Sequence, residues 1–383
     1  MSAEELRRLV GKLTVEQKVR LLTGATPWRL PAEPAIGLRS VVMSDGPVGV
    51  RGERWDERDT SLVLPSPTAL AATWSAPLVE RLGRLLAAEA RRKGVDVLLA
   101  PTLNLHRSPA GGRHFECYSE DPWLTAWTGA AYVRGVQAGG VAATAKHYVA
   151  NDSETERMTL DVAVAQRVLR EVYLVPFEAA AAAGVRVVMS AYNGVNGAPM
   201  SQSPLLADPL KREWGFAGPV VSDWGAVGST VPSARAAQDL VMPGPRGPWG
   251  KRLVAAVRAG DVPESTVDDK VLRLLRLAEQ VGALGTPVTV SAPEPAVSTT
   301  DAPEALLRET VAASAVLVRN TGLLPLDPTA LRRVAVLGWN AVTARIQGGG
   351  SAGVYPAAPV SPLAGIRAAL AGIADVVHAV GAF

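Results

Sequence analysis

Between about residues 38 and 285, short runs of apolar and β-branched residues alternate with longer stretches rich in Ala, Leu and Arg. The short runs predict strands at residues 39–44, 95–100, 141–149, 185–193, 218–224 and 239–244. The longer stretches predict helices at residues 75–94, 165–184 and 264–282. Strands that alternate with helices along a chain usually pair in parallel, so this pattern predicts an α/β domain with a barrel-like parallel sheet.

A change in composition marks the end of this domain. Residues 286–302 carry Pro, Ser and Thr without periodicity and predict an extended linker, which places the first domain at residues 1–285. Beyond the linker, the sequence predicts a helix at 303–315 and strands at 316–320 and 333–338. Residues 303–383 are too few for a complete doubly wound domain. We therefore expect this segment to be the truncated start of a second α/β domain. Either a C-terminal portion is missing, or the open sheet edges are covered in a homo-oligomer.

The bulk properties narrow the class of protein. At 383 residues the chain exceeds the usual size of a single core, which also favours two domains. Its formal net charge is +3, and the cationic residues are scattered among nearly as many anionic ones, without the basic stripe that nucleic acid requires. The N-terminus lacks the apolar core of a signal peptide, and no apolar run could span a bilayer. We expect a cytoplasmic protein that binds neither nucleic acid nor membrane.

Polar and aromatic side chains follow five of the predicted strands. The segments are "SDGP" (44–47), "NLHRSPAGGRHFECYSEDP" (104–122), "KHYVANDSETER" (146–157), "MSAYNG" (189–194) and "SDWGAV" (222–227). The carboxyl ends of parallel strands face one common mouth, so these side chains are expected to converge there. Carboxylate, guanidinium and imidazole groups beside Trp and Tyr suit a ligand with many hydroxyl groups.

Several of these residues also have a structural interpretation. Asp45 and Asp223 could equally be helix N-caps, and Asp121 before Pro122 is expected to be one. Lys146 and His147 are adjacent, so in a regular strand they would point to opposite faces. Both can reach one site only if the strand bends or ends there.

Other chemistries find little support in the sequence. No P-loop is present, and "GGGSAG" (348–353) resembles a phosphate-cradling loop only superficially, because no Lys-Ser or Lys-Thr follows it. His106 and His114 have no Cys or carboxylate at ligand spacing, so we expect no metal site and no cofactor. Cys117 is the single cysteine and is expected to be buried and inert. Glu154, Glu156 and Arg157 could form an ordinary surface charge network, and this is the preferred interpretation for Glu154.

Six segments taken together resemble glycoside hydrolase family 3, in its β-glucosidase branch. They are "SDGPVGVR", "LPSPTALAATWS", "NLHRSPAGGRHFECYSEDP", "GVAATAKHYVANDSETER", "MSAYNGVNG" and "GFAGPVVSDWGA". The resemblance runs from about residue 10 to residue 355. It implies a (β/α)8-type barrel followed by an α/β sandwich domain, and a retaining, exo-acting β-glucosidase of carbohydrate metabolism. Such an enzyme releases terminal β-D-glucose through a covalent glycosyl-aspartate intermediate.

The resemblance also implies roles for single residues. Asp223 would be the nucleophile. The residues that would hold the hydroxyls of the terminal sugar are Asp45, Arg113, Lys146 and His147. Met189 and Tyr192 would line the site, and Trp224 would form a stacking wall on the aglycone side.

Two departures from the family pattern bear on specificity and turnover. Members that act on N-acetylglucosamine carry "KHFPGHG" where this chain has "KHYVAND", so we expect a neutral sugar, glucose first and xylose or arabinose second. The family's acid/base glutamate lies well beyond "GGSAGV" (349–354), and neither Glu304 nor Glu309 matches its motif, so we assign it to no residue. Either the chain is a fragment of a longer enzyme, or another chain supplies the rest, or it no longer turns over unactivated glycosides. Two other hypotheses stay open beside the β-glucosidase, namely a non-hydrolytic sugar-binding fragment and a glycoside phosphorylase.

Overall fold

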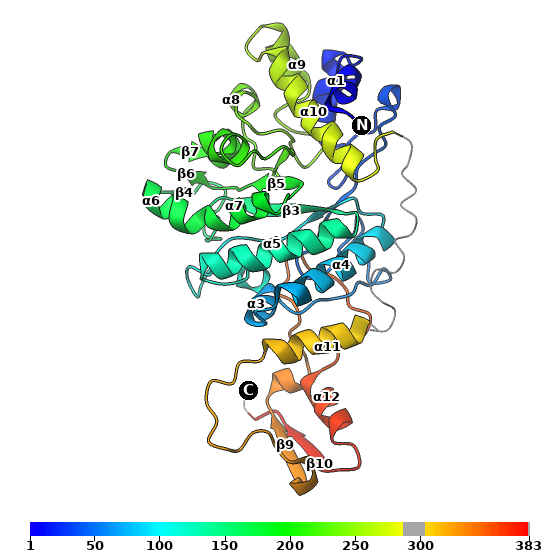
Figure 1. The fold of residues 1–383 in the computed structure, drawn as a ribbon, viewed down its shortest axis with the longest axis vertical. Helices are drawn as coiled ribbons and strands as arrows, with labels where there is room; N and C mark the ends of the chain where they lie inside the picture. The colour runs from blue at the N-terminus through cyan, green and yellow to red at the C-terminus, as the bar shows by residue number, and fades with distance from the viewer. Residues whose placement is uncertain (286–302, 382–383) are drawn as a thin grey trace.

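The computed structural model describes residues 1–285 and 303–381, which form a large unit and a small unit. The large unit contains the N-terminus and most of the helices, and the small unit lies at one end of the elongated molecule (Figure 1). Helix α11 (Pro303–Ser314) packs against α3 (Pro67–Ala72) and α4 (Ala76–Arg92) and joins the two units. The linker predicted at residues 286–302 lies outside the described residues.

A parallel sheet forms the centre of the large unit. Its strands are paired in the order β1 (Met43–Asp45), β2 (Val97–Leu99), β3 (Ala142–Tyr148), β5 (Val187–Ser190) and β8 (Val220–Ser222). Each strand lies within a segment predicted from the sequence, except that β1 extends one residue further, to Asp45. The strand predicted at residues 239–244 is reduced to isolated bridges, in which Leu240 pairs with Val221 and Val241 with Thr23.

The sheet curls toward closure at its two edges. On the β8 side, the bridge to Val241 leads on to residue 23. A few residues later, Leu30 N donates to Val41 O at 2.9 Å and Met43 N donates to Trp28 O at 2.8 Å, next to β1. Between β8 and β1, short bridges therefore continue the barrel where a regular (β/α)8 barrel would have full strands. The predicted α/β fold with a TIM-like barrel is confirmed.

Both faces of the sheet are buried, because successive strand residues enter different cores. In β2, Val97 and Leu99 join one apolar cluster while Leu98 joins the other. This alternation follows from the two-residue period of a strand, and it explains why the strand segments read as continuous apolar runs.

Helices surround this sheet and alternate with its strands (Figure 1). Asp121 is the N-cap of α5 (Pro122–Ala138), as predicted, and its side chain accepts a hydrogen bond from Trp123 N. The single helix predicted at 165–184 is divided into three consecutive segments, which are α6 (Gln166–Val168), a π-helix (Leu169–Tyr173) and α7 (Val175–Ala182). Pro176 lies in the first turn of α7, where its missing N–H leaves no helix hydrogen bond unmade. The helices of this unit not yet given are α1 (Ala3–Val10), α2 (Val15–Leu21), α8 (Val231–Arg235), α9 (Lys251–Arg258) and α10 (Glu264–Gln280).

A second, small sheet lies among the loops that follow β3 and β5. Its strands are β4 (Asp161–Val162), β6 (Gly194–Val195) and β7 (Ala198–Pro199), in the order β4-β6-β7. Asp161 accepts hydrogen bonds from the N–H of Gly197 at 2.8 and 3.0 Å, which fixes the turn between β6 and β7.

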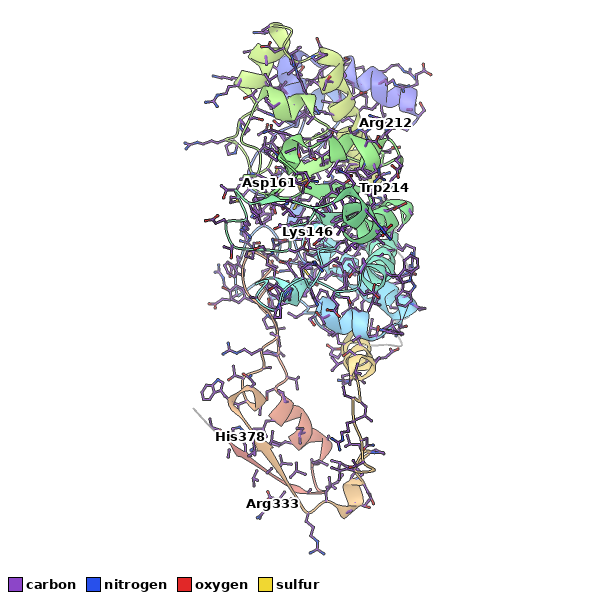
Figure 2. The ribbon with its side chains drawn as sticks, turned by 90° about the vertical axis from the view of Figure 1, so that its left-hand side faces the viewer. Lys146, Asp161, Arg212, Trp214, Arg333 and His378 are labelled. Carbon is purple, nitrogen blue, oxygen red and sulfur yellow. The ribbon has the colours of Figure 1, made fainter. Side chains whose placement is uncertain are left out.

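The small unit has an α/β arrangement. Its two strands, β9 (Arg333–Leu337) and β10 (Asp375–Ala379), pair in parallel, and α12 (Pro362–Ala369) connects them. Strand β9 confirms the prediction at 333–338, whereas the strand predicted at 316–320 is wrong. That segment is in no strand and is highly exposed, with Val318 91 % accessible, so its apolar residues find no strand to pair with among the described residues. In Figure 2, Arg333 and His378 mark this unit, far from Lys146 in the large one.

Across residues 1–285 and 303–381, no helix combines the length and the apolar character needed to cross a bilayer.

Candidate active site

A cavity of about 520 Å³ opens at the carboxyl ends of the parallel strands. All eight candidate residues line it, namely Asp45, Arg113, Lys146, His147, Met189, Tyr192, Asp223 and Trp224. Residues 348–352 of the small unit close one side. The volume is typical of a small-molecule site. The structure therefore brings together every residue that the sequence nominated, and adds a wall from the second unit.

Asp223 follows the last residue of β8 and is 8 % exposed. Its Oδ1 accepts the N–H of Trp224 at 2.8 Å. Its Oδ2 has no hydrogen-bond partner among the described residues and lies 3.6 Å from His147 Nε2. The next helix, α8, begins at Val231 with Thr230 at its N-cap position, so the N-cap interpretation of Asp223 is wrong. One carboxylate oxygen is thus free to meet a ligand.

Burial raises the pKa of Asp223, and the positive charges of Lys146 and Arg113 oppose this rise, together with the Trp224 N–H and the Tyr192 hydroxyl. A carboxylate that faces the cavity beside two cations is stabilised in its ionised form by those cations. The site therefore combines a desolvated carboxylate with the charges that keep it usable as a nucleophile.

Asp45 ends β1 and is bound rather than free. Its Oδ1 accepts from Lys146 Nζ at 2.7 Å, and Ser351 of the small unit provides a further hydrogen bond. Burial alone would raise the pKa of Asp45, but Lys146, Ser351 and the charge of Arg113 hold it below its usual value. No helix begins at Asp45 either, so its N-cap interpretation is also wrong.

Arg113 is held in the cavity wall by a glutamate that sequence reasoning missed. Its Nε donates to Glu116 Oε1 at 2.5 Å, and Glu116 Oε2 accepts from Thr102 Oγ1 at 3.1 Å and lies 4.0 Å from Lys146 Nζ. Burial would lower the pKa of Arg113, but the Glu116 carboxylate raises it, so the guanidinium stays charged. The spacing of three residues between Arg113 and Glu116 was the only signal in the sequence.

Asn104 was missed as well, and it fixes the imidazole of His147. Asn104 Oδ1 accepts from His147 N and lies 2.9 Å from its Nδ1, while Asn104 Nδ2 donates to His147 O at 3.0 Å. Arg113 Nη2 lies 3.1 Å from His147 Nε2. A guanidinium can only donate, so Nε2 accepts and the proton resides on Nδ1. Burial, reinforced by the charges of Arg113 and Lys146, lowers the pKa of His147 well below its usual value, so the ring is neutral.

Lys146 and His147 both line the cavity although they are neighbours in β3. The pairing register between β3 and β5 shifts between Ala145 and Tyr148, so the regular alternation of side chains is interrupted there. The bend that the sequence argument required is therefore present.

Aromatic side chains form the outer wall. Trp224 packs on Trp28 with ring centroids 5.3 Å apart, and its Nε1 donates to Pro27 O at 2.7 Å. The Tyr192 hydroxyl donates to Trp224 O at 3.1 Å, and the Arg157 guanidinium lies 4.7 Å from the Tyr192 ring. Arg157 therefore supports the cavity wall.

Glu154 also lines the cavity, where a surface position was expected. Its Oε2 accepts from Arg157 Nη1 at 2.7 Å, and its Oε1 lies 3.7 Å from Arg113 Nη1. The network of charges expected around Glu154 exists, but it faces the site.

The loop from the small unit fits closely against the barrel. A Cβ added to Gly348 would lie 2.0 Å from Phe115 Cδ1, so only glycine fits at this position. Gln347 pairs with both backbone groups of Val354, at 2.6 and 2.8 Å, and thereby fixes the base of the loop.

The remaining candidates have no direct part in the cavity. Cys117 is buried, and burial raises the pKa of its thiol. The rings of His106 and His114 pack edge to face, 4.7 Å apart. Within the described ranges, no three His, Cys, Asp or Glu side chains are grouped so that they could hold a metal ion.

The TIM-like barrel carries buried carboxylates, cations and an aromatic wall at its strand ends, which is where barrel enzymes place their active sites. Comparison with known families makes this specific. Residues 31–277 match the glycosyl hydrolase family 3 N terminal domain, and residues 315–382 match the glycosyl hydrolase family 3 C-terminal domain. The chain belongs to glycosyl hydrolase family 3.

Named relatives agree with this assignment. A β-glucosidase of Rhizobium radiobacter is 48 % identical, with 97 % of this chain and 46 % of the relative aligned. β-Glucosidase B of Emericella nidulans is 41 % identical, over 99 % of this chain and 45 % of the relative. The chain thus spans about half the length of the curated relatives that it matches.

Solved structures show the same likeness. A β-glucosidase from Kluyveromyces marxianus superposes with a TM-score of 0.89 at 35 % identity, covering 99 % of this chain and 47 % of that one. β-Glucosidase 3B from Thermotoga neapolitana, in complex with α-D-glucose, superposes with a TM-score of 0.85 at 33 % identity, covering 97 % and 55 %.

Proposed function

We propose that this chain carries the sugar-binding and nucleophilic half of a retaining, exo-acting β-glucosidase. In this proposal residues 1–285 are the catalytic barrel domain and residues 303–383 begin the α/β sandwich domain, with 286–302 as the linker. The named relatives, the cavity and its set of side chains support the proposal. The substrate is a glycoside with terminal β-D-glucose.

The observation that carries the proposal is the environment of Asp223. Its Oδ2 lies inside the cavity without a hydrogen-bond partner among the described residues, while the charges of Lys146 and Arg113 favour ionisation. A retaining glycosidase needs such a carboxylate at the anomeric carbon. A carboxylate that served only to hold the fold would be expected to have both oxygens bound.

The reaction then proceeds in two displacements. An Asp223 oxygen attacks the anomeric carbon, the bond to the aglycone oxygen breaks, and an acid gives that oxygen a proton. Water later attacks the same carbon and gives a proton to the conjugate base of that acid, while the bond from the carbon to the Asp223 oxygen breaks, so glucose is released and the carboxylate is restored. Glu116 and Glu154 are both committed to arginine partners, so we assign the acid/base to neither.

The other cavity residues bind and orient the sugar. Asp45 offers carboxylate oxygen, while Lys146 and Arg113 offer donors to neighbouring hydroxyls. Neutral His147 presents Nε2, and Met189 and Tyr192 line the wall. Trp224, stacked on Trp28, gives the aglycone side a flat apolar surface.

Covalent trapping tests the nucleophile. The chain is incubated with 2,4-dinitrophenyl 2-deoxy-2-fluoro-β-glucoside, whose leaving group needs little protonation, so labelling does not depend on the unassigned acid. Peptide mass spectrometry should find the fluoroglucosyl ester on Asp223. Asp208→Asn, which changes an exposed carboxylate outside the cavity, serves as the control and should label normally. A label on another residue, or none on a folded chain, would refute the proposal.

The cytoplasmic location and the self-association expected from the sequence are tested by none of these observations and stay predictions.

A further inference from the structure

Two large aromatic side chains stand exposed beside the cavity, one from each unit. Trp55 of the barrel is 54 % exposed and Tyr355 of the small unit is 38 % exposed. Their ring centroids are 5.9 Å apart and the ring planes are tilted by 37°. We call this pair the outer platform.

The outer platform is held in place by the backbone. Ser61 N donates to Tyr355 O at 2.7 Å, and Ser61 bridges to Pro356 in parallel. A Cβ added to Gly353 would lie 3.5 Å from Trp55, so the loop that closes the cavity passes directly against this ring. The two rings are therefore fixed relative to the cavity.

Arg51 connects the outer platform to the cavity wall. Its guanidinium carbon lies 4.8 Å from the centre of the Trp28 ring, which lines the cavity, and 5.2 Å from the centre of the Trp55 ring. Trp224, Trp28, Arg51 and Trp55 thus form a continuous series that begins next to the nucleophile. A ligand that leaves the cavity along the aromatic wall would next meet Trp55.

The guanidinium of Arg51 is short of partners. Its Nε is buried without a hydrogen bond, and within residues 1–285 and 303–381 the group makes no ion pair. A guanidinium carries five N–H donors, so donors remain available for ligand hydroxyls. Flat aromatic faces beside unused donors are suited to a sugar ring, which offers a C–H face and hydroxyl groups at its edge.

We propose that the outer platform is a subsite for the third ring of a β-linked gluco-oligosaccharide, counted from the sugar held in the cavity. This rests on the proposed function, because it places the first ring beside Asp223 and the second against Trp224 and Trp28. The substrate class that follows is short β-gluco-oligosaccharides of at least three units.

Chain-length dependence tests the subsite. Trp55→Ala is compared with wild type on 4-nitrophenyl β-glucoside, cellobiose and cellotriose. The variant should lower kcat/KM for cellotriose about five- to tenfold, the range typical of losing one aromatic contact. The two shorter substrates should be unaffected. Trp123→Ala, which removes a 71 % exposed tryptophan outside the cavity lining, should change none of the three.

Direct binding separates failure of the subsite from failure of the proposed function. If no substrate is turned over, calorimetry with cellotriose on both proteins still decides, and weaker binding to Trp55→Ala supports the subsite. Tyr355→Ala provides a second variant if Trp55→Ala does not fold. Equal affinity, or an equal loss on all three substrates, would overturn the proposal.

Discussion

Replacing Lys146 by methionine leaves the Asp45 carboxylate in a buried position without its cation. The two side chains are 3 % and 8 % exposed and 2.7 Å apart, so water cannot replace the lost partner. Removing one member of a buried pair typically costs about 3–5 kcal/mol. Because Ser351 and Arg113 still favour the Asp45 charge, we expect the low end of that range, about 3 kcal/mol in the free energy of unfolding at pH 7.

Urea denaturation of wild type and Lys146→Met measures this difference. The surface pair Arg167 and Glu171, which is 83 % and 60 % exposed, provides the control, and Glu171→Gln should cost less than about 0.5 kcal/mol. The double variant Asp45→Asn with Lys146→Met should be less destabilised than the sum of the single variants, because no unpaired charge then remains.

The pH dependence follows from the direction of the Asp45 shift. Its folded pKa is lowered, so the stability it contributes is fully present above its unfolded pKa of about 3.9 and is lost as the pH falls through the folded pKa. The difference between wild type and Lys146→Met should therefore shrink below about pH 4. A cost at pH 7 as small as that of Glu171→Gln, or additive single variants, would contradict the interpretation of the pair as buried and coupled.

Two further predictions concern the cavity, and a third concerns Asp152, a carboxylate outside the cavity lining that accepts from Leu105 N. His147, whose pKa burial holds well below its usual value, should stay neutral through the pH range where a free imidazole titrates, with its proton on Nδ1 facing Asn104. A ¹⁵N NMR titration of the four histidines in which His147 shifts like a free imidazole would contradict this. Gly348→Ala pushes a Cβ into the Phe115 ring and should raise KM for aryl glucosides about tenfold; Gly365→Ala, where nothing lies within 4 Å, is the control. Burial raises the pKa of Asp152 to about 6, so stability falls as the pH rises from about 4 to 6. Asp152→Asn should therefore stabilise the chain by about 3 kcal/mol at pH 7 and not at pH 4, as thermal melting would show.

The parts of the fold that sequence patterns predicted are those where local periodicity and burial coincide. The strands of the central sheet are continuous apolar runs because both faces are covered, and all five lie in predicted segments, apart from the last residue of β1. Residues 316–320 have the same apolar character but pair with no strand among the described residues. Periodicity reports the tendency of a segment, whereas pairing depends on a neighbour that the local sequence does not encode.

The residues of the site also divide into those that the local sequence indicates and those that depend on distant contacts. Residues such as Asp45 and Asp223 could be nominated because they stand at strand ends, where topology dictates convergence. Asn104 and Glu116 act through other side chains, and their contacts arise only when distant loops fold together. Glu154 was misjudged because a charged residue in a polar segment looks the same whether it faces solvent or a cavity.

The contact between Ser351 and Asp45 makes the cavity a joint property of two units. A ligand that binds more tightly when residues 348–352 of the small unit form one wall of the cavity stabilises the packing of the two units against each other by mass action. By the same linkage, weakening the docking lowers the apparent affinity for the ligand without altering a single residue that touches it. Substitutions on α11, where the two units meet, could therefore tune saturation with substrate from a distance.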